Sequence, residues 1–203
     1  MRQDTEIKTT FYITAVAVSA RLASVLKEAK NISLEAMNAK ALVARAGENV
    51  RTFKPITDFM VELASDTIRL VEDINREALM ISKASLIALR GYEAVNHFSV
   101  AKVRAKNALY RDSFEGPLQE SERDLIVFKQ NLLRNIRRLN ELLEEIETRM
   151  LAANVVTSTS RLEAATVSTL YRSNFEAIVE KFENAAKNIR TTVRDCRKVL
   201  NER

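Results

Sequence analysis

Residues 38–53 read NAKALVARAGENVRTF, and the glycine in this stretch decides how the chain folds. Apolar residues alternate at steps of three and four on both sides of Gly47, which is typical of helices packed along a seam. The first seam runs through Phe11, Ala15, Val18, Leu22, Val25, Ala29, Ile32, Ala36, Ala39, Val43 and Ala46. The second runs through Phe53, Ile56, Met60, Leu63, Thr67, Leu70 and Ile74. Folding between Asn49 and Val50 pairs small seam residues with large ones, so the sequence predicts an antiparallel hairpin.

The composition favours long helices along the whole chain. Its 203 residues include only three glycines, two prolines and no tryptophan, which argues against a β fold. A third seam spans Leu132 to Met150, and a fourth spans Phe175 to Val199. Two hairpins with one apolar stripe each are expected to bury those stripes together. The prediction is an all-α fold in which long antiparallel coiled-coil hairpins form an up-down-up-down four-helix bundle. Open hairpins that dimerise are the alternative.

We expect residues 1–203 to form a single elongated helical bundle made of two halves. The first half, residues 1–115, is a hairpin with its tip near residues 47–52. Gly116-Pro117 separates the second helix from the third, and proline is favourable in the first helical turn. The second half, residues 116–203, is a hairpin whose tip we expect near residues 154–160, the polar run NVVTSTS. There Ser160 and Glu163 have the spacing of a capping box.

The chain lacks the residues that most site chemistry needs. His97 and Cys196 are its only histidine and cysteine, too few for a zinc or haem site. It has no phosphate-binding glycine loop and no nucleophile–base set. We therefore expect no enzyme, no metal and no cofactor. A net charge of +5 with 29% charged residues is typical of solvated helix faces, so no nucleic-acid partner is expected.

The localisation also follows from what the sequence lacks. The longest apolar run, FYITAVAV, is eight residues long, whereas a membrane span needs about 18 or more. The N-terminus is not a secretory signal. The prediction is a cytoplasmic protein without a membrane span.

The residues around Gly47 resemble a known family. Asn38-Ala39, Ala44 to Glu48, Arg51-x-Phe53 and Leu63-Ala64 are similar, without gaps, to the signalling tip of bacterial methyl-accepting chemotaxis proteins. In that family two cytoplasmic hairpins form a four-helix bundle whose tip binds a coupling protein and a histidine autokinase. The resemblance implies a signalling protein with those partners, and association with receptors or a homodimer. It also implies a partner-binding site of five residues: Asn38, Arg45, Glu48, Arg51 and Phe53.

The stretch departs from the family at several positions. The family has glutamate where Leu42 stands, glycines at Val50 and Thr52, and a valine at Pro55. No methylation site of the family type is present. One chain with two hairpins could imitate the bundle that receptors build as dimers, which suggests a regulatory receptor mimic. A non-catalytic helical scaffold that binds an unrelated partner is an alternative. A small-ligand sensor, with a pocket near Ser82, Ser85 and Tyr92, is another.

Overall fold

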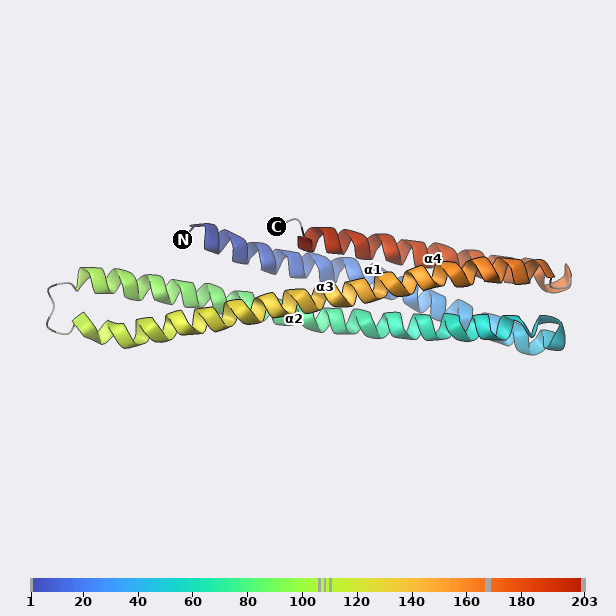
Figure 1. The fold of residues 1–203 in the computed structure, drawn as a ribbon, viewed down its shortest axis with the longest axis horizontal. Helices are drawn as coiled ribbons and strands as arrows, with labels where there is room; N and C mark the ends of the chain where they lie inside the picture. Colours follow the sequence, from blue (N-terminus) through green and yellow to red (C-terminus); the bar gives the residue numbers. More distant parts are fainter. Residues whose placement is uncertain (1, 106, 108, 110, 167–168, 202–203) are drawn as a thin grey trace. The chain divides into compact units, whose positions relative to one another are not determined.

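The computed structural model describes residues 2–105, 107, 109, 111–166 and 169–201, with the side chains of 13–47, 50–105, 107, 109, 113–165 and 171–201. It contains four long helices, drawn in chain order from blue to red in Figure 1. They are α1 (Arg2–Ala46), α2 (Phe53–Arg104), α3 (Glu115–Thr166) and α4 (Thr169–Asn201). Short 3-10 helices span Gly47–Val50 and Arg111–Phe114. No strand occurs among the described residues, and the predicted all-α four-helix fold is confirmed.

The helices are divided between two compact units. Unit 1 holds residues 1–17 and 76–139, and unit 2 holds residues 18–75 and 140–203. Both units draw on both predicted hairpins, so the division does not follow the predicted halves 1–115 and 116–203.

Unit 2 is a four-helix bundle, and α1 and α2 pair in it as an antiparallel hairpin. Lys40 Nζ lies 2.6 Å from Asp58 Oδ1, and Ser19 Oγ donates to Asn75 Oδ1 at 2.8 Å. The first contact matches the register expected from folding the chain at Asn49 and Val50, and the second shows that the two helices remain neighbours further from the turn. The paired seam residues are buried: Ala29, Ile32, Ala36 and Ala39 on α1, and Met60, Leu63, Thr67, Leu70 and Ile74 on α2.

The buried stripe of α4 differs in part from the predicted seam, which runs through Phe175, Ile178, Phe182, Ala185, Ile189, Thr192, Cys196 and Val199. The buried residues are Phe175, Val179, Phe182, Ala185, Ala186, Ile189, Val193, Cys196 and Leu200. The predicted members Ile178, Thr192 and Val199 are only partly buried. Apolar residues stand side by side at several of these positions, for example Ile178 and Val179. Steps of three and of four were therefore both compatible with the sequence.

The second hairpin tip predicted near residues 154–160 is wrong. Helix α3 continues through this run to Thr166, and the connection at residues 167–168 lies outside the described residues. The hydroxyls of the run donate to backbone carbonyls one turn earlier, such as Thr157 to Asn154 at 2.8 Å and Ser160 to Val156 at 2.6 Å. Thr157 and Ser160 are also buried. Because internal bonds satisfy the hydroxyls, packing overrides the low helix propensity of these residues.

Unit 1 consists of the first part of α1, the second part of α2 and the first part of α3. Helix α2 passes through Gly91 without a break. A Cβ at Gly91 would lie 2.9 Å from Leu125 Cδ2, so glycine permits the close approach of α3. Lys102 Nζ pairs with Glu115 Oε1 at 2.9 Å and joins the end of α2 to the start of α3. Gly116 and Pro117 lie in the first turn of α3, where the missing N–H of proline breaks no helical hydrogen bond.

Candidate functional site: the Gly47 turn

The turn between α1 and α2 depends on Gly47, the only described residue with a positive φ, of 63°. That conformation costs an L side chain roughly 1–2 kcal/mol, and glycine adopts it freely. The 3-10 helix Gly47–Val50 follows at once, and Lys54 N donates to the Arg51 carbonyl at 3.2 Å. Pro55 lies in the first turn of α2, where its ring fits. The turn is therefore short and has a defined conformation.

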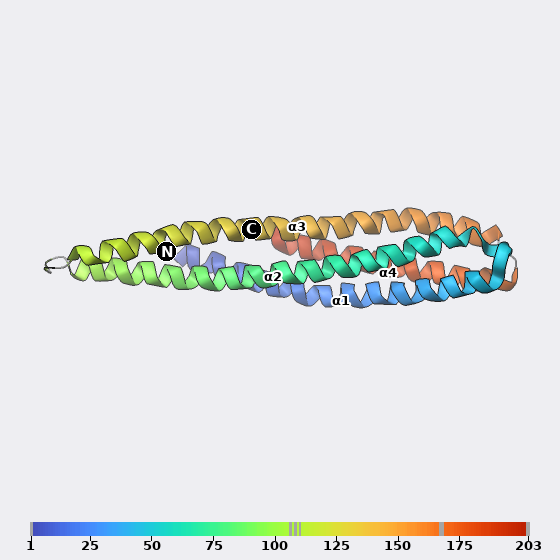
Figure 2. The same ribbon diagram turned by 90° about the horizontal axis from the view of Figure 1, so that it is seen from below.

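Buried apolar side chains hold the turn in place. Val50 is fully buried, Ala46 is 7% exposed and Phe53 is 1% exposed. The ring of Phe53 stacks on Phe175 near the start of α4, with centroids 4.0 Å apart and planes 29° apart. Figure 2 shows the Gly47 turn and the start of α4 at the same end of the bundle. Stacking of aromatic rings adds about 0.5–1.5 kcal/mol beyond burial, so Phe175 helps to fix the turn.

The five predicted site residues do not all lie at the turn surface. Arg45 and Arg51 are exposed on either side of Gly47. Asn38 is exposed on α1, two helical turns or more before the glycine. Glu48 belongs to the turn, but its side chain lies outside the described residues. Phe53 is buried, so it supports the turn and offers no surface to a partner.

Sequence reasoning missed Phe175 as a residue of this site. Its position in the sequence could have indicated this role, because Phe175 begins the seam of α4 as Phe53 begins the seam of α2. Val50 is also part of the support. Its side chain is fully buried, so it adds to the apolar core under the turn.

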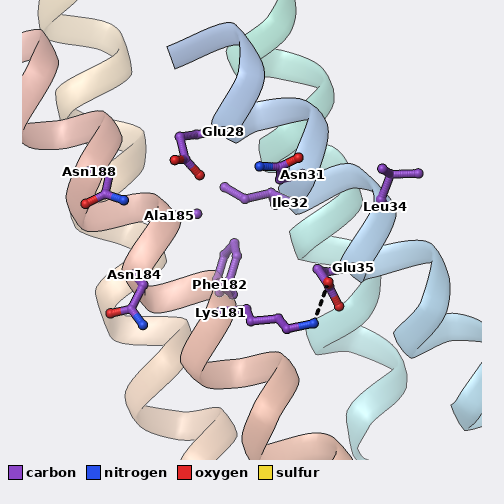
Figure 3. A pocket seen from close by; sticks show the side chains of 10 residues that line it. All are labelled: Glu28, Asn31, Ile32, Leu34, Glu35, Lys181, Phe182, Asn184, Ala185 and Asn188. Atoms are coloured by element: carbon purple, nitrogen blue, oxygen red, sulfur yellow. Dashed lines mark hydrogen bonds and ion pairs between the residues drawn. The ribbon is translucent and has the colours of Figure 1, made fainter. Parts of the chain in front are cut away.

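A second feature of unit 2 is a groove between α1 and α4, with a volume of about 300 Å³. Figure 3 shows Glu28 and Asn31 of α1 on one side and Asn188 of α4 on the other. Ile32 and Phe182, both buried, form its apolar base. Lys181 Nζ bridges to Glu35 Oε1 at 2.8 Å. Amides and carboxylates can hydrogen-bond a polar ligand, but the groove contains no nucleophile–base pair.

Two titratable groups of unit 2 have shifted pKa values. The hydrogen bond from Arg194 has the largest effect and lowers the pKa of Glu147. Burial opposes this shift, and the hydrogen bond from Arg197 lowers the pKa further. The two donors lie 2.5 and 2.7 Å from the carboxylate oxygens. Burial raises the pKa of the Cys196 thiol to about 11, so the thiol stays protonated and unreactive at neutral pH.

The predicted small-ligand region around Ser82 and Ser85 belongs to unit 1. Ser82 Oγ donates to the Ala78 carbonyl at 2.9 Å. Ser85 is 3% exposed, and its hydroxyl has no hydrogen-bond partner among the described residues. No group of three potential metal ligands occurs in the described part of the chain. None of the helices, as far as they are described, has a stretch long and apolar enough to cross a membrane.

Comparison of the chain with family models, with curated proteins and with solved structures finds no match.

Proposed function

We propose that the protein is a chemoreceptor-like signalling protein whose Gly47 turn contacts a chemotaxis coupling protein and its histidine kinase in the cytoplasm. One observation supports this above the others. The residues that resemble a receptor tip fall on a left-handed glycine turn, with Arg45 and Arg51 exposed on its two sides. Heptad packing alone would not place such residues at the turn.

The support under the turn suits it to binding. Val50, Phe53 and Phe175 are buried, so the backbone that carries the two arginines is held by packing. Side chains on a fixed backbone lose less conformational entropy on binding than side chains on a mobile loop. Arginine also forms bidentate pairs with carboxylates, so acidic groups on the partner are the expected contacts.

The single-chain bundle favours a regulatory role. Helices α1 and α2 carry the receptor-like turn, whereas α3 and α4 have no equivalent of it in the sequence. A receptor dimer would present two such turns, and this chain would present one. In our proposal it occupies a coupling protein on one side without assembling a normal receptor array.

A pull-down with purified coupling protein tests the contact. The wild type is compared with an Arg45→Ala/Arg51→Ala variant and with an Arg51→Ala/Glu48→Ala variant. A Lys27→Ala/Lys187→Ala variant removes two exposed lysines of unit 2 away from the turn and serves as the matched control. We expect the wild type and the control to retain the coupling protein and both turn variants to lose it. Equal retention by all four proteins would refute the contact.

The molar mass in solution tests the mimic part of the proposal separately. Because one chain supplies all four helices of unit 2, we expect a monomer of 23.0 kDa by light scattering. A dimer at micromolar concentration would favour ordinary receptor geometry in its place.

A further inference from the structure

The outward face of α2 in unit 1 has a regular pattern of its own. Basic residues recur there at every seventh position: Arg76, Lys83, Arg90, His97 and Arg104. Beside them lie exposed apolar side chains: Leu79, Met80, Leu86, Ile87 and Val100, between 41% and 55% exposed. We call these ten residues the α2 stripe. The opposite face of the same helix is buried through Ala78, Ile81, Ser85 and Ala88, whereas the five apolar side chains of the stripe are exposed.

The apolar surface of the chain is concentrated in the unit that carries the stripe. Of the 17 large apolar side chains that are exposed among the described residues, 12 belong to unit 1. Single exposed apolar residues are normal on protein surfaces, whereas residues that recur along one helix face mark an interaction site. A shallow hollow lies at the far end of the stripe, lined by His97, Val100 and Arg104 among others.

The net charge of the chain is also concentrated in unit 1. Counted along the sequence, the whole net charge of +5 falls in unit 1, and unit 2 has equal numbers of acidic and basic residues. Some cations of unit 2 are paired within the unit, as Arg149 is with Asp66 and Arg197 with Glu147. Lys83 and Arg90, by contrast, have no ion-pair partner among the described residues.

We propose that the α2 stripe binds an acidic amphipathic helix of a partner protein. A helix with apolar residues at seven-residue spacing would pack on the leucines and isoleucine, and acidic residues at the same spacing would face Lys83 and Arg90. This site is independent of the Gly47 turn, and the proposal does not rest on the function of that turn.

The chemistry of the stripe favours this occupant over two others. A second copy of the stripe would set basic residues against basic residues, which is repulsive. A membrane surface would have to accommodate Glu93, which is exposed in the apolar row between Leu86 and Val100. The stripe also has no aromatic residue, and interfacial helices commonly insert aromatic side chains. An acidic helix can place a basic residue opposite Glu93.

A synthetic peptide of about 28 residues tests the proposal. It carries leucine at two positions of each heptad and glutamate at the position that faces the basic row. A second peptide has lysine at each glutamate position. Binding of both peptides to the full chain is measured by fluorescence anisotropy at low and high salt. Vesicles of phosphatidylglycerol form a third arm, measured by co-sedimentation.

The variants separate the stripe from the general charge of the protein. Lys83→Glu/Arg90→Glu reverses two stripe cations, and Lys27→Glu/Lys187→Glu reverses two exposed cations of unit 2. We expect the acidic peptide to bind the wild type and the control with salt-dependent affinity, and the stripe variant about tenfold more weakly. Leu86→Gln is expected to weaken binding as well, while Leu162→Gln, at a 73% exposed position of unit 2, leaves it unchanged.

Three results would overturn the proposal. They are equal affinity of the stripe variant and the wild type, equal affinity for the acidic and lysine peptides, and binding to the anionic vesicles without binding to the acidic peptide. Circular dichroism of every variant establishes that it is folded. Should the charge reversal reduce helicity, Lys83→Gln/Arg90→Gln replaces it with the same expected direction.

Discussion

Truncating Phe53 tests whether the Gly47 turn is held by packing. The side chain is 1% exposed and stacks on Phe175 at 4.0 Å. Removing a fully buried phenylalanine side chain costs about 3–5 kcal/mol. We expect Phe53→Ala to lower the free energy of unfolding of unit 2 by that amount, because the ring that stacks on Phe175 is removed and a cavity remains in the core.

The assay is urea unfolding with a probe in unit 2. Since the chain has no tryptophan, Tyr171→Trp on α4 provides a single fluorescent reporter in the reference protein and in every variant. A double-mutant cycle with Phe175→Ala isolates the stacking, for which we expect a coupling free energy of about 0.5–1.5 kcal/mol. Leu162→Ala, at an exposed position, is the control and is expected to stay within about 0.5 kcal/mol of the reference. A cost below about 1 kcal/mol for Phe53→Ala, or strict additivity of the two phenylalanine substitutions, would refute the reasoning.

Three further predictions concern the same unit and its turn. Gly47→Ala is expected to destabilise the protein by about 1–2 kcal/mol because φ is positive there, while Gly116→Ala, with open space around it, is expected to be neutral or slightly stabilising in the same urea titration. Because the pKa of Glu147 is lowered in the folded protein, its ion pairs stabilise the fold fully above about pH 4.5, the ordinary pKa of a glutamate. This stabilisation is lost as the pH falls through the lower pKa of the folded state. Glu147→Gln should therefore reduce the fall in unfolding free energy over that acid range, and an unchanged acid slope would contradict the pairing. Cys196, with its pKa raised to about 11, should react with iodoacetamide far more slowly in the native protein than in urea, and equal rates would show that the thiol is accessible.

The sequence predicted the features of the fold that depend on one strong signal. The seams of α1 and α2 were predicted to pair at constant register around Gly47. The ion pair between Lys40 and Asp58 agrees with that register. The seam of α4 was ambiguous because Ile178 and Val179 are both apolar. The turn expected at residues 154–160 was wrong because hydroxyls that disfavour helix in isolation bond the helix backbone in place, as in Ser160.

The candidate site was predictable only in part, for a related reason. The positions of Arg45 and Arg51 follow from the fold point, because exposed residues that flank a turn lie close together. The role of Phe53 does not follow, since a residue beside a turn can face a partner or the core. Its contact with Phe175 depends on α4, which is more than a hundred residues away along the chain. Only the packed structure decides between these roles.

Hydrogen–deuterium exchange with and without the chemotaxis coupling protein tests the central claim most directly. Exchange of the backbone amides of the Gly47 turn reports contact without any substitution. Our account predicts slower exchange in residues 45–52 on addition of the coupling protein and unchanged exchange along the α2 stripe. Unchanged exchange at the turn under saturating coupling protein, or protection confined to other segments, would contradict it.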